Sequence, residues 1–204
     1  MTFKTQTKAM RPGHGLARGH RRGWLAGLAA LLAVFVWPGV AASPPSPTEY
    51  QIKAAFLYNF AKYIEWPAEK FPQSNSPIVM GVLGKDPFGV NLEKTIQGQH
   101  IGGRPLVVKR FEDIEGINGC HLLFVSSSER RRVADILERI KNDHILTVGE
   151  SERFAAQGGV VNFIMVESKV RFEINVDAAR RARLKISSKL LNLAQVVRDD
   201  KGTE

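Results

Sequence analysis

The side chains that most often perform catalysis are few in this 204-residue chain, and they are scattered. After the first forty residues, the histidines are His100, His121 and His144. They lie far apart in the sequence, and no cysteine or carboxylate accompanies them at the spacing of a metal site. The serines at 126–128 have no G-x-S-x-G turn around them and no base nearby in the sequence. These patterns predict no catalytic residues and no metal site.

Glycines, the residues that surround a nucleotide phosphate in Gly-rich loops, follow the apolar run at 77–84 or lie within it. They are Gly81, Gly84 and Gly89. Their spacing matches neither G-x-G-x-x-G nor a P-loop. The sequence therefore predicts no nucleotide cofactor, and no other cofactor is indicated.

A small anion site is the one ligand site that the motifs suggest. Ser126 and Ser127 stand at the end of an apolar run and at the expected start of a helix, where backbone N–H groups attract anions. The simpler interpretation is that these serines only cap the helix. The alternative is that Ser126, Ser127 and Lys85, together with Glu150, bind a phosphate or carboxylate ligand.

Residues 1–42 have the pattern of a signal peptide. Six basic residues and no acid precede an apolar run at 24–37, and small residues follow at 40–42. The run is shorter than the roughly 20 residues of a membrane span, so cleaved export is expected rather than an uncleaved anchor. Arg21-Arg22 also resembles a twin-arginine signal, although the general secretory route is favoured.

The leader also carries most of the excess positive charge. Six of the 29 Lys and Arg residues and none of the 20 acids lie in it, which leaves 23 bases against 20 acids and a net charge of +3. The basic balance therefore indicates export and no nucleic-acid partner. Cys120 is the only cysteine and cannot form an intrachain disulfide. It precedes the apolar run 121–125, which favours a buried thiol over an intermolecular bridge.

Apolar runs and helical patterns alternate through the middle of the chain. Strands are predicted at 77–84, 104–111, 121–126 and 145–149. Helices are predicted at 86–97, with Asp86 as N-cap, and at 129–141, with Ser126 and Glu129 as a capping box. This order predicts a three-layer, Rossmann-like α/β fold, in which helices flank a mostly parallel central sheet.

The C-terminal part predicts a hairpin followed by a helix. An apolar run at 160–166 and an alternating run at 169–175 surround a turn at Glu167-Ser168, so an antiparallel hairpin at the sheet edge is expected. Further along, one helical face repeats apolar residues at Ile186, Leu190, Leu193 and Val197. We expect a linker at 43–48, a single domain at 49–198 that closes with this amphipathic helix, and a polar tail at 199–204.

The helix predicted at 49–64 after the Thr48 cap has an unusually wide apolar arc. One edge of it consists of Ile52, Phe56, Phe60 and Tyr63. Such an arc can be buried within its own fold, or it can pair two copies of the chain as a homodimer. Both interpretations remain open at the level of sequence.

Seven motifs together resemble the YfiR family. They are YQIKAAFLYNF at 50–60, WP at 66–67, GVLG at 81–84, CHLLF at 120–124, GG at 158–159, RFEIN at 171–175 and LKISSKLL at 184–191. The resemblance spans residues 50–197, nearly all of the expected mature chain. It implies a periplasmic, non-enzymatic repressor that binds the periplasmic sensor region of an inner-membrane diguanylate cyclase. Repression would lower cyclic di-GMP and biofilm formation, and an outer-membrane lipoprotein could sequester the repressor.

The resemblance places the partner-binding region at 167–185. The residues that it implies are Glu167, Arg171, Glu173, Arg180 and Lys185. The single Cys120 departs from better-known relatives, which contain disulfides, so redox control through intrachain bridges does not carry over. The alternative function is a periplasmic small-ligand binding protein that reports to a membrane sensor. A small hydrolase would need the fold to bring Ser127 to His144 or His121.

Overall fold

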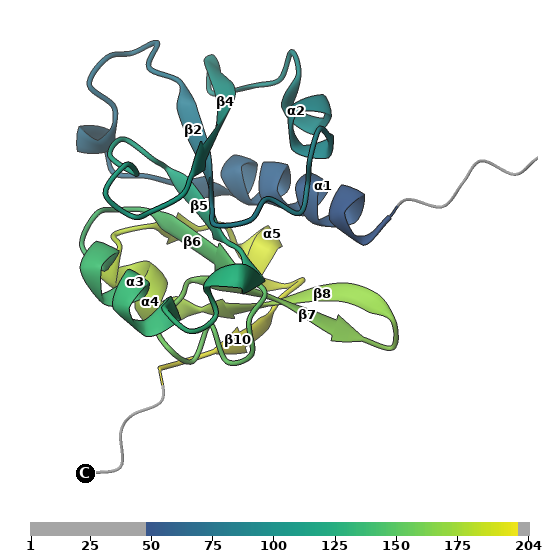
Figure 1. Cartoon of the computed structure of the whole chain (residues 1–204). Coiled ribbons are helices and arrows are strands. Elements are labelled where there is room, and N and C mark those ends of the chain that lie inside the picture. The colour runs from purple at the N-terminus through teal and green to yellow at the C-terminus, as the bar shows by residue number, and fades with distance from the viewer. Residues whose placement is uncertain (1–47, 200–204) are drawn as a thin grey trace, which may run out of the picture. The chain divides into compact units, whose positions relative to one another are not determined.

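The structure, a computed structural model, describes residues 48–199 (Figure 1). The expected signal peptide, nearly all of the linker and the last five residues lie outside this range. The helices are α1 (Glu49–Tyr63), α2 (Asn91–Ile96), α3 (Val133–Ile140), α4 (Val176–Arg181) and α5 (Ser188–Leu191), with 3₁₀ turns η1 (Ala68–Lys70) and η2 (Ser127–Glu129). The strands are β1 (Ile64–Glu65), β2 (Ile78–Leu83), β3 (His100–Ile101), β4 (Arg104–Phe111), β5 (Leu122–Val125), β6 (Leu146–Gly149), β7 (Val161–Val166), β8 (Lys169–Asn175), β9 (Lys185–Ile186) and β10 (Gln195–Val197). Among these residues, no helix has the length and apolar character that crossing a bilayer requires.

An eight-stranded sheet with the order β10-β8-β7-β6-β5-β2-β4-β3 forms the centre of this region. The five strands β4, β2, β5, β6 and β7 are parallel to one another, and antiparallel pairs occur at β3–β4 and at the β7–β8 hairpin. The predicted α/β fold with a mostly parallel sheet and a C-terminal hairpin is therefore confirmed. The chain passes from β2 to β4 on one side of it and later to β5 on the other side. The carboxyl ends of β2 and β5 therefore form the switch point where ligands of such sheets commonly bind.

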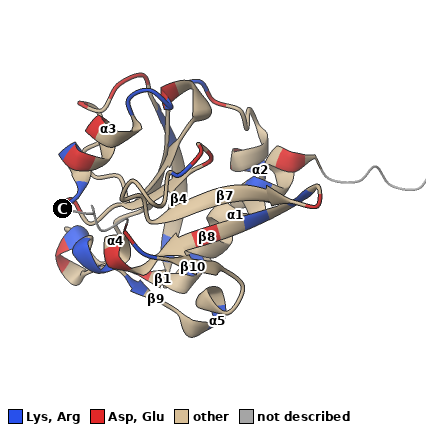
Figure 2. Ribbon diagram, turned by 90° about the horizontal axis from the view of Figure 1, so that it is seen from below, with Lys and Arg blue, Asp and Glu red and all other residues tan. Residues whose placement is uncertain are grey.

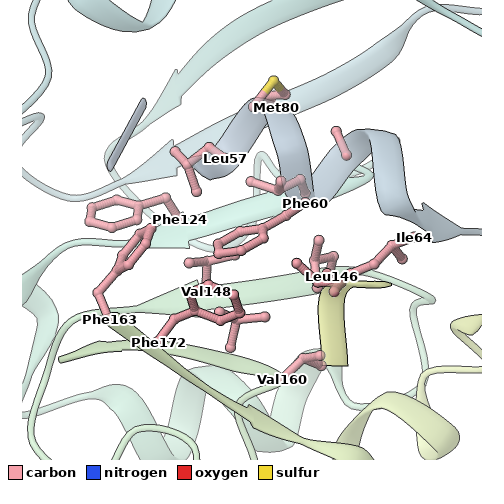
Figure 3. Packing of buried hydrophobic residues seen from close by; sticks show 14 of the residues in the cluster. Leu57, Phe60, Ile64, Met80, Phe124, Leu146, Val148, Val160, Phe163 and Phe172 are labelled. Atoms are coloured by element: carbon pink, nitrogen blue, oxygen red, sulfur yellow. The ribbon is translucent and has the colours of Figure 1, made fainter. Parts of the chain in front are cut away.

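Both faces of the sheet are covered, which explains the continuous apolar runs in its strands. Leu122 and Phe124 of β5 point into a cluster beneath α1 and α2, whereas Leu123 and Val125 pack against α3. Figure 3 shows Phe60 of α1 pointing into the first cluster. Its ring contacts the hairpin rings of Phe163 and Phe172 at centroid distances of 5.7 and 5.0 Å.

Helix α1 and the β7–β8 hairpin lie close to the positions predicted from the sequence. Thr48 and Gln51 form a capping box at the start of α1, which ends at Tyr63. Glu167 and Ser168 have φ values of 49° and 59°, as the two-residue turn of a tight hairpin requires. The hairpin is not the sheet edge, however, because β10 pairs in parallel with β8.

Two predicted helices begin later than expected. Asp86 does not cap α2: its Oδ1 accepts the N–H of Phe88 at 2.7 Å, and Gly89 has a left-handed φ of 54° that delays the helix to Asn91. Ser126 and Glu129 do not form a capping box, because the Ser126 N–H already donates to Leu83 O of β2 at 3.0 Å. A 3₁₀ turn follows instead, and α3 begins at Val133.

The long C-terminal amphipathic helix is the largest error of the sequence prediction. Arg183, with a φ of 56°, follows α4, and β9 then pairs with β1. Only α5 is helical thereafter, and Leu193, expected on the buried face, is 69% exposed. The residues at helical spacing belong to three short elements, β9, α5 and β10, or to the turns between them. The spacing therefore does not mark one face of a single helix.

Candidate functional site

A cleft of about 610 Å³ lies between the start of α1, the loop after β6 and the base of the β7–β8 hairpin. Residues lining it include Glu49, Tyr50, Lys53, Ser127, Glu150, Ser151, Asn162 and Glu173. Glu150 and Ser127 follow β6 and β5 at their carboxyl ends, so the cleft opens at the end of the sheet where ligands of α/β folds bind. Its volume is in the range of small-molecule sites.

Lys53 provides the positive charge at the floor of the cleft. It lies one turn after Glu49 and one turn before Leu57, on the buried side of α1, and only 4% of the residue is exposed. Its Nζ lies 2.7 Å from Glu150 Oε2, and the two side chains are 5% and 6% exposed. A second bond joins Nζ to Glu49 Oε1. The pair thus ties α1 to the end of β6 inside the protein.

Hydrogen bonds to the two carboxylates keep Lys53 charged. Burial alone would lower the pKa of the Lys53 ammonium, but hydrogen bonds to Glu150 and Glu49 outweigh it and raise the pKa above its usual value. The Tyr50 hydroxyl lies 3.3 Å from Glu150 Oε2, and burial together with that carboxylate raises the pKa of the phenol. Lys53 therefore stays an ammonium and Tyr50 a neutral phenol at neutral pH.

The loop after β6 places Glu150 by means of two glycines. A Cβ on Gly149 would lie 2.4 Å from the Phe154 ring, and one on Gly159 would lie 2.2 Å from it. Phe154 is fully buried between them, which folds the intervening segment tightly against the sheet. This packing explains Gly159 of the GG pair, whereas Gly158 has a left-handed φ of 103° that favours glycine.

The hairpin contributes a second polar pair to the cleft. Asn162 of β7 is opposite Glu173 of β8 in the ladder, and its Nδ2 donates to Glu173 Oε2 at 3.2 Å. Asn162 is 3% exposed, although its strand is otherwise apolar at this depth. A polar amide in that position places a hydrogen-bonding group in the cleft wall.

At the predicted anion site, the nearest acceptor to the Ser127 amide is a carboxylate of the protein itself. Ser128 Oγ accepts the Lys85 backbone N–H at 3.0 Å, so the segments that follow β2 and β5 are in contact at the switch point. Ser126 is buried, and its Oγ accepts the Ser128 N–H. Glu150 Oε1 lies 3.4 Å from the Ser127 N, on the amide that was expected to attract an anion. Binding of an external anion there stays a prediction.

The residues implied in partner binding lie along the hairpin and on the elements after it. Glu167 is in the exposed turn, Arg171 projects from the exposed side of β8, and Glu173 lines the cleft. Arg180 of α4 and Lys185 of β9 line a different hollow, beside Trp66. Figure 2 shows charged residues both on α4 and β9 and along β8 to the hairpin tip. The structure thus distributes these residues over two neighbouring surfaces instead of one.

The apolar edge of α1 is divided between core and surface. Phe60 is fully buried in its own chain, which follows from its packing on the hairpin rings. Ile52, Phe56 and Tyr63 are half-buried and pack against the same core. Ile52 and Phe56 also line a hollow with Arg171, so part of this edge remains accessible. Pairing of two copies through it stays a prediction.

The remaining reactive side chains serve the core. His121 Nδ1 accepts the Val79 N–H at 3.1 Å, and His144 Nδ1 lies 3.0 Å from Ala182 O. Neither ring hydrogen-bonds to Ser127 among the described residues. Within residues 48–199, no three His, Cys, Asp or Glu side chains gather as metal ligands would. Cys120 is a buried free thiol, as predicted.

Sequence analysis missed Lys53, Ser151 and Asn162. A signal existed for Lys53, because it falls four residues before Leu57 and seven before Phe60 on the buried helical stripe. Asn162 interrupts an apolar strand in the same way. A polar residue at a core position of an otherwise apolar pattern was therefore the signal that could have identified these two site residues.

Comparison with known proteins gives one result. The family model described as YfiR/HmsC-like matches residues 50–195. No curated protein matches the chain.

Proposed function

The chain belongs to the YfiR/HmsC-like family, and from this premise we propose that it is a periplasmic regulator that represses an inner-membrane diguanylate cyclase. Repression acts through binding to the periplasmic sensor region of the cyclase, and it lowers cyclic di-GMP and biofilm formation. The observation that carries the proposal is the extent of the family match, since residues 50–195 include α1, the whole sheet core and the hairpin.

The β7–β8 hairpin is the element that we propose contacts the cyclase. Its tip exposes two apolar side chains, Met165 at 52% and Val166 at 45%. Arg171 and Lys169 stand beside them and are exposed. Exposed apolar groups with a cationic rim are typical of protein-binding surfaces, in which a few buried anchors provide most of the affinity.

Repression by binding requires a difference in affinity. The protein must bind the inactive sensor conformation more tightly than the active one, because a ligand with equal affinity for both states shifts no equilibrium. An outer-membrane lipoprotein that competes for the same hairpin would lift repression. Self-association through Ile52 and Phe56 would present two hairpins to a dimeric sensor.

The decisive experiment measures cellular cyclic di-GMP after deletion of the gene, with complementation by the full-length chain and by a version lacking residues 1–42. We expect cyclic di-GMP to rise on deletion and to return to its original level only with the full-length version. No rise on deletion would contradict the proposal. It would favour the second candidate, a periplasmic small-ligand binding protein, which the cleft beside Lys53 supports.

A further inference from the structure

Two buried polar atoms in the wall of the cleft have no hydrogen-bond partner within residues 48–199. They are Asn162 Oδ1 and Ser151 Oγ, in residues that are 3% and 9% exposed. Buried polar atoms are nearly always hydrogen-bonded, because an unsatisfied one costs the full free energy of its desolvation. Both atoms belong to side chains that line the same cleft, so a molecule bound there can satisfy them together.

The Glu173 carboxylate determines which end of the Asn162 amide is left without a partner. A carboxylate only accepts hydrogen bonds, and the Asn162 Nδ2 donates to it at 3.2 Å. The reversed amide would place two oxygens against each other. The remaining group is therefore an acceptor, and it requires an N–H or O–H donor from the ligand.

The charges of the lining also favour a donor-rich, positive ligand. The charged residues are Glu49, Lys53, Glu150, Glu152, Arg153 and Glu173, with a formal net charge of −2. Lys53 is engaged by Glu49 and Glu150 at the floor of the cleft. Glu173 has only one oxygen bonded to Asn162, so its second oxygen can accept a charge-assisted bond.

An apolar wall completes the site. Phe163, Ile164 and Met165 line the same cleft along β7, with Ala156 and Val197 nearby. We propose that the cleft binds a small organic ammonium compound, with its N–H donors on Asn162 Oδ1 and Glu173 and its apolar stem along β7. Ser151 Oγ provides a further hydrogen bond to a polar substituent. This proposal rests on the residues of the cleft and does not depend on the proposed repression of a cyclase.

The test uses three probes with one stem: 2-phenylethylamine, 2-phenylethanol and 3-phenylpropanoate. We expect calorimetry on the purified protein to give the amine a Kd on the order of 1 mM or lower, as a ligand of this size allows. The alcohol and the acid should bind at least about tenfold more weakly, because they lack the charged donor. Amide NMR signals of Ser151, Asn162 and Glu173 should shift with the amine.

Two substitutions that remove one carboxylate charge separate the site from general electrostatics. Glu173→Gln should weaken amine binding about tenfold or more, because it removes the charged acceptor. Glu138→Gln removes the same charge from an exposed position on α3 and should leave the Kd unchanged. Equal binding of amine and alcohol, or amide shifts confined to other parts of the protein, would overturn the proposal. The probe series on the unmodified protein decides the matter even if Glu173→Gln does not fold.

Discussion

At the scale of single residues, the Lys53–Glu150 pair is the most consequential polar contact in the described region. Replacing Lys53 by Met would leave the Glu150 carboxylate 6% exposed and without its countercharge. Loss of one partner of a buried ion pair typically costs about 3–5 kcal/mol. We expect Lys53→Met to lower the free energy of unfolding by that amount in urea denaturation.

Lys62 in the last turn of α1 provides the matched control, because it is exposed. Lys62→Met removes the same charge from the same helix and should change the free energy of unfolding by less than about 1 kcal/mol. Similar effects of the two substitutions would mean that the buried pair is not a stabilising link.

His121 gives the protein a specific sensitivity to acid. Burial, reinforced by the nearby Lys70, lowers the pKa of His121 to about 4. The native ring therefore stays neutral where the unfolded ring, with a pKa of about 6.5, takes up a proton. Stability from this group is present above pH 6.5 and is lost as pH falls toward 4, by up to about 3 kcal/mol.

His121→Asn should flatten that dependence. The Asn oxygen can still accept the Val79 N–H that Nδ1 accepts at 3.1 Å, but it does not titrate. Urea unfolding of both proteins at pH 7 and pH 4 measures the difference. The same loss of stability in both proteins would show that His121 does not cause it.

Cys120 should be chemically inert in the native protein. The thiol is fully buried, and burial raises its pKa to about 12, so almost no reactive thiolate forms at neutral pH. We expect reaction with a disulfide reagent such as DTNB to proceed only at the rate of opening of the fold, and to become fast in urea. Rapid labelling without denaturant would contradict burial of this side chain.

At the scale of elements, the loop between β6 and β7 depends on Phe154 fitting between two glycines. Gly149→Ala would place a Cβ 2.4 Å from this ring, and overpacking of this kind costs about 1–3 kcal/mol. We expect a loss of stability in that range, measured by thermal or urea unfolding. The cost should shrink in a Phe154→Leu background, because the two positions interact directly.

Gly116→Ala is the control for this prediction. Its added Cβ would meet only the edge of Phe111, at 3.3 Å. Its effect should stay below about 1 kcal/mol. An equal cost for Gly116→Ala and Gly149→Ala would show that the loss does not come from the contact with Phe154, because the effect of Gly→Ala on the unfolded chain is stabilising.

Helices and strands were predictable where neighbouring residues in the sequence are sufficient to determine them. The capping box at Thr48 begins α1, and the alternation of Val170, Phe172 and Ile174 defines β8. The late start of α2 follows from a local turn, in which Asp86 accepts the Phe88 N–H and Gly89 is left-handed. The late start of α3 was not predictable, since it depends on a distant partner, Leu83 O for the Ser126 N–H. The C-terminal helix failed for the same reason, because pairing of Ile186 with Ile64 outweighs helical periodicity.

At the scale of the whole molecule, the sheet order explains which parts of the site could be foreseen. Lys85 and Ser126 follow β2 and β5, and the parallel-sheet prediction alone places the ends of both strands at one edge. The sheet order then makes the two strands neighbours. The cleft brings together α1, β6 and β7, and its central contact joins Lys53 to Glu150, which are 97 residues apart. No local pattern shows that Lys53 will meet Glu150, because only the fold decides which strand lies beneath α1.

The proposed docking surface leads to a prediction about the intact system. Arg171 is exposed on β8, and Arg180 is 76% exposed on α4 and paired only at the surface with Asp177, at 3.2 Å. Such surface pairs contribute little to stability, so Arg171→Glu and Arg180→Glu should fold normally. Arg171→Glu reverses a charge beside the apolar hairpin tip, where like-charge or unpaired contacts weaken association. We expect it to relieve repression and to raise cyclic di-GMP toward the level of the deletion strain.

Arg139→Glu on α3, which is 57% exposed and distant from the hairpin in sequence, is the control and should leave repression intact. Because the two surfaces are separate hollows, the variants also distinguish them. An effect of Arg180→Glu alone would move the docking surface from the hairpin to the α4–β9 side, and no effect of either would remove both from the interface.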